Sequence, residues 1–247
     1  TTNEEKQALI SKILPAKLEL IDFSPAFATL SPKDYIEWLH KTYQPSFIVI
    51  GNNHTFGKNA AGTPKDLIEH SAQYGYKVFV VPPVAVSTQH VSSTAIRQYI
   101  KSGDIQRANE LLGYNYTLSG EVVKGEEIGR TLGFPTANIQ IDAQKLLPQK
   151  GVYATVAKVD GKTYPAMTNI GTRPTVSNAE QTTIETHILN FDGQLYGKVL
   201  KIQFLKKVRD EIKFTTREEL ENQLYQDSLV VSAYIDNIKK GKEIKFI

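Results

Sequence analysis

The apolar pattern of this 247-residue chain changes near residue 113, and this change constrains the fold more than any other feature. Before that point, short apolar runs alternate with segments bounded by helix-capping residues, which is typical of alternating strands and helices. After it, short apolar runs follow one another with only tight-turn residues between them, which is typical of antiparallel β structure. The sequence therefore predicts two domains, residues 1–113 and 114–247, the first α/β and the second mostly antiparallel β.

The first half contains one complete strand–helix–strand pattern. An apolar run at 46–51 (SFIVIG) is followed by Thr63 and Pro64, which suit a helix N-cap and the first helical position. Gly75 stands where this helix would stop, and a second apolar run at 77–81 follows directly. The pattern predicts two parallel strands joined by a right-handed crossover.

Further elements are expected on both sides of this unit. Residues 18–23 form another strand candidate. Three more helices are expected: one capped by Ser31 and running to about Thr42, one capped by Ser93 and running through Lys101, and one over 104–112 that stops at Gly113. The first half is thus α/β with few strands.

Tight turns dominate the second half. Asp160-Gly161 and Asp192-Gly193 are hairpin signals, because tight reverse turns need positive φ angles that glycine tolerates. The expected strands are 117–123, 151–159, 162–167, 183–189 and 198–205. This pattern predicts a small closed antiparallel barrel.

The chain closes with a helical pattern. Thr216 and Glu219 have capping-box spacing, and the apolar residues after them recur at helical intervals. We expect one long helix that covers an open end of the barrel.

Composition limits the partners of the chain. Its 29 basic and 26 acidic residues give a formal charge of +3, too balanced for the electrostatic footprint of a nucleic-acid binder. The absence of cysteine removes disulfides and thiol chemistry, and the apolar stretches near Phe47 and Phe79 are too short to span a bilayer. We expect a cytoplasmic protein with small-molecule partners, without nucleic acid or membrane; the sequence does not reveal its oligomeric state.

One segment carries features of a phosphate site. Three glycines and one arginine punctuate GEEIGRTLGFPTANI, namely Gly125, Gly129, Gly133 and Arg130. Glycines let backbone N–H groups approach anionic oxygens, and arginine adds a fork of donors. Thr136 and Asn138 point the same way on an extended segment and can share one hard cation such as Mg²⁺. The alternative, that the glycines only turn a hairpin capped by Thr and Asn, is the commoner meaning of such spacing.

A carboxylate in the segment TTIETHILNFDGQLYG is the candidate base. Strand alternation places Glu185 and His187 on the face opposite Ile184 and Ile188. Phosphoryl transfer to an alcohol needs a group that orients the hydroxyl and accepts its proton, and a glutamate near a metal–ATP site can serve. The alternative is a solvated strand glutamate paired with a lysine, which position alone favours because exposed glutamates are common.

Four segments together resemble a known family. GRTLGFPTANI, NIGTRPTV, IETHILNFDGQLYGK and RDEIKF stand in the order found in riboflavin kinase domains, and the whole chain resembles the bacterial bifunctional riboflavin kinase/FAD synthetase family. Four ordered segments over roughly 90 residues are far more specific than a lone glycine-rich loop. The resemblance implies an enzyme of FMN and FAD biosynthesis, in which a riboflavin kinase transfers the γ-phosphate of ATP to riboflavin to form FMN.

The resemblance also implies a fold and site residues. The fold is a partial nucleotidyltransferase-type parallel α/β domain followed by a six-stranded antiparallel riboflavin-kinase barrel with a C-terminal helix. In the barrel, the implied roles are Mg²⁺–ATP binding by Thr136 and Asn138, a phosphate flap with Gly125 and Arg130, and Glu185 as catalytic base. By the same matching, Ile188, Asn190 and Tyr196 would line the nucleotide site, and Arg209 and Phe214 would approach the flavin. For Tyr196 and Phe214, the alternative is ordinary core packing.

The first half resembles the nucleotidyltransferase domain of the same family. GNNHTFGK at 51–58, which contains Asn53, and VSSTAIR at 91–97 carry this resemblance. Ser93, Thr94 and Arg97 lie at an expected helix N-terminus, where free N–H groups favour an anion such as pyrophosphate; a simple serine cap with a surface arginine is the alternative.

The first half departs from the family pattern in one respect. The adenylyl-transfer site of the family also carries an H-x-G-H motif in an upstream strand-turn-helix, and no two of the five histidines here are three residues apart. We therefore expect numbering to begin several tens of residues inside that domain. FMN adenylyltransferase activity is expected in the complete protein, but not in these residues alone.

Two other functions remain as alternatives to the kinase. A non-catalytic flavin-binding or regulatory module would keep the barrel, but it would not require Thr136, Asn138 and Glu185 together. A nucleic-acid-binding barrel would need a basic face with interleaved aromatic residues, which the sequence does not show.

Overall fold

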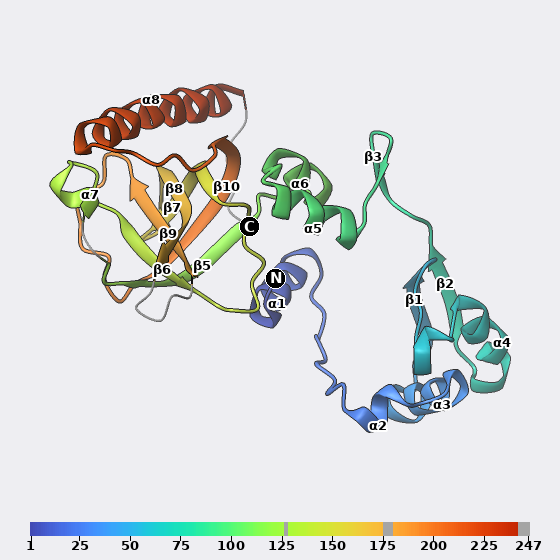
Figure 1. Ribbon diagram of the computed structural model, residues 1–247. Helices are drawn as coiled ribbons and strands as arrows, with labels where there is room; N and C mark the ends of the chain where they lie inside the picture. Colours follow the sequence, from blue (N-terminus) through green and yellow to red (C-terminus); the bar gives the residue numbers. More distant parts are fainter. Residues whose placement is uncertain (126–127, 175–179, 242–247) are drawn as a thin grey trace. The chain divides into compact units, whose positions relative to one another are not determined.

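The computed structural model describes residues 1–125, 128–174 and 180–241 (Figure 1). The chain divides into two compact units. One, here called the α/β unit, spans Pro15–His90; the other, the barrel unit, combines Thr1–Leu14 with the chain from Val91 onward. Each unit is described by itself.

The α/β unit contains the expected strand–helix–strand arrangement. Strand β1 (Phe47–Gly51) pairs in parallel with β2 (Lys77–Val81), and α4 (Pro64–Tyr74) connects them. Gly75 ends α4 in the left-handed conformation at φ 74°. Helix α3 (Pro32–Tyr43) is capped by Ser31, as expected. The other elements are α2 (Pro25–Ala28), the 3₁₀ turn η1 (Lys58–Ala60), β3 (Ala85–Val86) and β4 (Gln89–His90).

The prediction of a strand at 18–23 is wrong. These residues have no regular secondary structure, and the parallel sheet of this unit contains β1 and β2 alone among the described residues. Leu20, Ile21 and Phe23 are exposed, so the apolar run buries little surface. An apolar run becomes a strand only where a neighbouring strand takes up its backbone hydrogen bonds, and none does so here.

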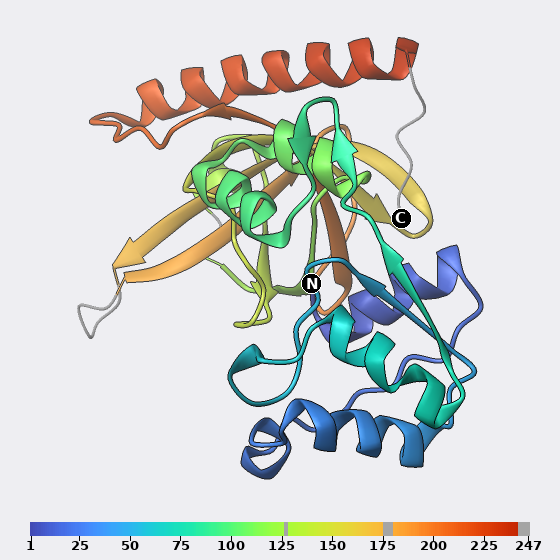
Figure 2. The same cartoon turned by 90° about the vertical axis from the view of Figure 1, so that its right-hand side faces the viewer.

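A closed six-stranded barrel forms the centre of the barrel unit, and the predicted fold is confirmed. The strands are β5 (Thr117–Val123), β6 (Ala137–Ile141), β7 (Gly151–Val159), β8 (Lys162–Pro174), β9 (Glu180–Ile188) and β10 (Val199–Arg209). Their order around the barrel is β10-β5-β6-β9-β8-β7, and every neighbouring pair is antiparallel. Figure 2 shows β8 and β9 side by side as a long hairpin.

Only one of the two expected hairpin turns is a hairpin. Asp160 and Gly161 join β7 to β8 with φ angles of 47° and 82°, which suits a tight primed turn. Asp192-Gly193 instead lies in the connection from β9 to β10, two strands that are not neighbours in the barrel. The prediction of a hairpin at Asp192-Gly193 is therefore wrong, because a connection to a distant strand must cross the barrel rather than reverse on itself.

Helices cover the barrel on its outer side. Helix α8 (Arg217–Gly241) begins with the expected capping box, in which Glu219 N–H donates to Thr216 Oγ1 at 3.2 Å. Figure 1 shows α8 lying across the barrel. Its buried Val231 and Ile235 pack against outward-facing residues of β7, β8 and β10 such as Val156. The helix thus lies along the barrel wall and not over an open end, because this wall offers a second apolar surface.

Two helices before the barrel pack on it. Helix α5 (Ser93–Ser102) is capped by Ser92, whose side chain accepts from Ala95 N–H, so the cap lies one residue before the expected Ser93. Helix α6 (Ile105–Leu112) ends at Gly113 as expected. Both helices contribute to the barrel core, for example through Ile105. The expected boundary after Gly113 separates α6 from β5 in sequence, whereas by packing these helices belong with the barrel.

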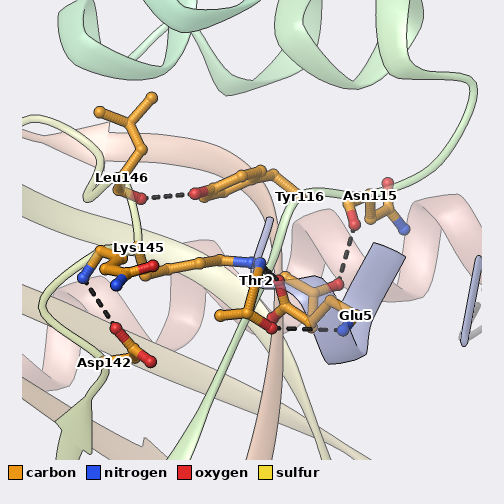
Figure 3. Close-up of polar contacts among 9 residues, drawn as sticks. Thr2, Glu5, Asn115, Tyr116, Asp142, Lys145 and Leu146 are labelled. Atoms are coloured by element: carbon orange, nitrogen blue, oxygen red, sulfur yellow. Dashed lines mark hydrogen bonds and ion pairs between the residues drawn. The ribbon is translucent and has the colours of Figure 1, made fainter. Parts of the chain in front are cut away.

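Helix α1 (Asn3–Ile13) is attached to the barrel unit by a buried ion pair (Figure 3). Lys145 Nζ pairs with the Glu5 carboxylate, and the lysine side chain is only 5% exposed. The ammonium group lies 5.1 Å from the centroid of the Tyr116 ring, whose hydroxyl donates to the Leu146 carbonyl. Burial raises the pKa of Tyr116 and lowers that of Lys145. The pair therefore depends on Glu5 to keep a charged lysine in this position.

Candidate active site

Four polar side chains form a row across three neighbouring strands, β6, β9 and β8. Glu185 on β9 has Asn138 of β6 as its partner on one side and Asn169 of β8 on the other. Thr136, just before β6, donates from Oγ1 to Glu185 Oε2 at 3.3 Å. Ala137 is buried between Thr136 and Asn138, so these two side chains share the outer side, as expected.

Strand β9 has the expected alternation. Ile184 and Ile188 are buried in the barrel core, and Glu185 and His187 lie on the opposite face. The core therefore fixes the direction of both polar side chains.

Close packing explains why two of the three glycines cannot carry a side chain. A Cβ atom on Gly125 would lie 2.0 Å from Asn138 Nδ2, and one on Gly129 would lie 2.3 Å from the Phe134 carbonyl oxygen. Neither glycine has a positive φ, whereas Gly133 does, at 78°. Turning a hairpin is therefore not what requires Gly125 and Gly129; the close approach of their loop to the 134–138 segment is. Residues 126–127 lie outside the described part of the chain.

Two cavities meet at Thr136, which lines both. The first, of about 340 Å³, is lined by several of the expected nucleotide-site residues, Arg130 of α7 (Ile128–Thr131), Thr136, Ile188 and Tyr196. The second, of about 310 Å³, is lined by Thr136, Glu185 and both expected flavin-site residues, Arg209 and Phe214.

Asn138 and Asn190 lie outside these two cavities. Asn138 lines a third cavity of about 440 Å³ beside Lys124. Asn190 is exposed just after β9 with a φ of 55°, and it lines neither of the two cavities that meet at Thr136. Tyr196 is 50% exposed, so core packing does not account for it.

Arg209 is held by helix α8. Its Nη2 donates to Asp227 Oδ2 at 2.7 Å, and its Nε lies 2.9 Å from the same oxygen and 3.0 Å from Oδ1. The guanidinium carbon lies 5.9 Å from the centroid of the Phe214 ring. Leu224 of α8 lines the second cavity beside them. The arginine thus joins β10 to the helix that supplies one wall of this cavity.

Sequence reasoning did not assign three polar residues of the second cavity, Asn169, His187 and Glu211. Asn169 lies in the quoted NIGTRPTV segment, but only the register of β8 against β9 places it opposite Glu185. His187 was placed on the face of Glu185 without a role. Its Nδ1 lies 2.8 Å from the Pro135 carbonyl oxygen, and burial lowers its pKa.

The residues expected for adenylyl transfer fall in both units. Asn53 lines a cavity of about 470 Å³ with His54, Thr63 and Val80, near the carboxyl ends of β1 and β2. Ser93, Thr94 and Arg97 are exposed on α5, in the barrel unit.

The described residues hold neither a cluster of metal-ligating side chains nor a helix suited to a bilayer. Within 1–125, 128–174 and 180–241, no three His, Cys, Asp or Glu side chains gather as a metal centre. In the same part of the chain, no helix is long and apolar enough to cross a membrane.

Comparison with known families agrees with the fold. Residues 112–235 match the riboflavin kinase family model, and residues 1–95 match the FAD synthetase model. The barrel is thus of the riboflavin kinase class, preceded by a region of the FAD synthetase class. The chain belongs to the bifunctional riboflavin kinase/FMN adenylyltransferase family.

Relatives match nearly the whole chain. The bifunctional riboflavin kinase/FMN adenylyltransferase of Bacillus subtilis is 34% identical over 97% of this chain and 76% of its own length. The Escherichia coli K12 protein of the same name is 35% identical over 87% of this chain and 68% of its own. A crystal structure from Streptococcus pneumoniae, described as a macrolide-efflux protein, covers 94% of this chain and 74% of that chain with a TM-score of 0.86 and 32% identity.

Proposed function

We propose that the barrel unit is a riboflavin kinase that transfers the γ-phosphate of ATP to the terminal ribityl hydroxyl of riboflavin. The observation that carries this proposal is the contact between Thr136 and Glu185, since Thr136 lines both cavities and Glu185 lines the second. A phosphoryl donor and an alcohol acceptor must meet head to head for in-line transfer. Two cavities that meet at one threonine, beside one carboxylate, suit this requirement.

The linings of the cavities suggest which substrate each one holds. The first contains Arg130, whose guanidinium can bind phosphate oxygens, and this supports ATP there. The second is walled by Phe134, Met167, Phe214 and Leu224, which suits a flat apolar isoalloxazine ring. We assign ATP to the first cavity and riboflavin to the second.

A Mg²⁺ ion fits the donor set on the outer side of β6. The Thr136 hydroxyl and the Asn138 amide offer hard oxygens on one side of the strand, next to the Glu185 carboxylate. Mg²⁺ in phosphoryl-transfer sites takes few protein ligands, and substrate phosphates and water supply the rest. When bound, the ion neutralises charge on the phosphates. Thr136 and Asn138 are the residues proposed to hold it.

Glu185 is proposed as the base that orients the ribityl hydroxyl and accepts its proton. Its carboxylate lines the riboflavin cavity and already accepts a hydrogen bond from Thr136. The position is therefore close to the proposed metal and open to the acceptor side.

The test is FMN formation from riboflavin and MgATP by the purified chain and by Glu185→Gln. Glutamine keeps the shape but cannot accept the proton, so kcat should fall by about two to four orders of magnitude with little change in binding of either substrate. Glu121→Gln is the matched control, because Glu121 is exposed on β5 and lines neither cavity. A folded Glu185→Gln protein with the wild-type rate would remove Glu185 from the mechanism, and one that binds neither substrate would make Glu185 structural.

The location and the partners follow from this activity. ATP and riboflavin are small-molecule substrates, and a cytoplasmic supply of ATP fits the proposed reaction. The complete absence of cysteine agrees with such a location without requiring it.

A further inference from the structure

The segment that carries Thr136 is not held in place by strand pairing. The pairing of β6 with β9 consists of Ala137 with Thr186 and Asn138 with Glu185. The next pair along the ladder would join Thr136 to His187, but the ladder stops before it. Pro135 has no N–H group to offer. Some other contact must therefore set the position of Thr136.

His187 supplies that contact. Its Nδ1 lies 2.8 Å from the Pro135 carbonyl oxygen, 52 residues away in sequence. Because a carbonyl oxygen only accepts, Nδ1 must carry the hydrogen, and Nε2 of the neutral ring is left without one. The side chain of His187 therefore joins β9 to the segment before β6 at the point where the backbone hydrogen bonds between the two strands end.

We propose that His187 is a positioning residue of the kinase site, which holds the Pro135 carbonyl and thereby keeps Thr136 against Glu185. This inference rests on the proposed function of the site, although the hydrogen bond itself does not. Thr136 is the next residue after Pro135, so a shift of that carbonyl moves the Thr136 hydroxyl directly. The hydroxyl contacts Glu185 and lines both substrate cavities.

The residues just before Pro135 are held by contacts outside β9 as well as by the ring of His187. Phe134 packs against the apolar layer between barrel and α8, and its N–H donates to the Gly129 carbonyl at 2.8 Å. The Phe134 ring also meets the His187 ring edge-on, with centroids 5.2 Å apart. The residues before Pro135 are thus tied to α7 and to the layer beneath α8, and His187 ties the same segment to β9.

The test uses two variants of similar size. His187→Asn keeps an N–H donor on the atom attached to Cγ, where Nδ1 stands, whereas His187→Leu keeps the bulk without a donor. In the leucine variant, loss of one hydrogen bond should lower kcat/KM for MgATP by about tenfold, through a higher KM and a lower kcat. The asparagine variant should stay within about threefold of the wild type, and KM for riboflavin should change less than KM for MgATP in both.

Two measurements do not depend on turnover. Nitrogen-15 NMR of the wild-type imidazole should show a protonated Nδ1 and a bare Nε2, and the opposite tautomer would overturn the proposal. Hydrogen exchange should quicken over residues 132–138 in His187→Leu but not in His187→Asn. If the wild type forms no FMN while both results hold, the proposed function fails and the contact stands.

Three kinetic outcomes would overturn the positioning role. If His187→Asn is as slow as His187→Leu, with loss of an ionisation from the pH–rate profile, His187 itself transfers the proton. If both variants turn over as the wild type does, the bond is irrelevant to Thr136. If exchange quickens over the whole barrel and kinetics change only through unfolding, His187 is a packing residue.

Discussion

The ion pair between Arg209 and Asp227 should contribute strongly to the stability of the barrel unit. The Asp227 side chain is 3% exposed and that of Arg209 is 17% exposed, so both charges are largely removed from water. The carboxylate accepts from Nε and Nη2 of Arg209 and also from Gln223 Nε2 at 2.8 Å. Removing one partner of such a pair leaves the other charge buried without compensation.

Asp227→Ala is the sharpest perturbation of this pair. Breaking a buried pair costs about 3–5 kcal/mol, and we expect about 3 kcal/mol here, since Arg209 keeps some access to water and its bond to the Asp210 carbonyl. Arg209→Met should cost a similar amount, because Asp227 then keeps only Gln223. The double variant should cost less than the sum, because neither charge is stranded.

Urea unfolding followed by far-UV circular dichroism gives the free energies. Hydrogen exchange of peptides from 217–238 assigns the change to α8, whose first turns carry Leu220 and Leu224 into the wall of the second cavity. An Asp227→Ala protein within about 0.5 kcal/mol of wild type would refute the reasoning, since that is the range of ordinary surface substitutions. Additive effects in the double variant would show that the two residues act separately.

Three further predictions concern the two activities and the core. Asn138→Ala should weaken Mg²⁺-dependent ATP binding, measured by titration calorimetry, and should leave riboflavin binding unchanged. If the variant binds MgATP as tightly as the wild type, Asn138 does not hold the proposed ion. Thr168→Val interrupts a buried hydroxyl row, Thr186 to Thr168 to Thr155, with both contacts at 2.9 Å, and should cost about 1–3 kcal/mol in urea unfolding; no loss would mean that the hydroxyls are replaceable by methyls. The chain should form no FAD from FMN and ATP by chromatography, because the H-x-G-H histidines that stabilise charge on the transferring phosphate are absent from its sequence, and clear FAD accumulation would contradict this.

Local signals were sufficient for most elements of the fold. The helix over Pro64–Tyr74 has Thr63, Pro64 and Gly75 at its ends, and both residues of Asp160-Gly161 adopt positive φ. Such signals act within a few residues and need no tertiary partner. The 18–23 run had the apolar character of a strand but no neighbour, and a missing neighbour cannot be seen in a local pattern. Strand β8 also runs on to Pro174, beyond the expected end at 167, because its pairing with β9 continues as far as Pro174 with Glu180.

In the site, too, features set within one strand could be predicted, and features set by pairing between strands could not. Alternation along one strand places Thr136 with Asn138, and Glu185 with His187, because side-chain direction has a period of two. Contacts across strands depend on register, and no single strand encodes it: Asn169 meets Glu185 only because β8 and β9 pair in one particular register. The bond from His187 to Pro135 is one step further from the sequence, since it forms where the ladder between β6 and β9 stops. Residues that hold a reacting group at the end of a ladder are therefore the ones that motif reading is least able to find.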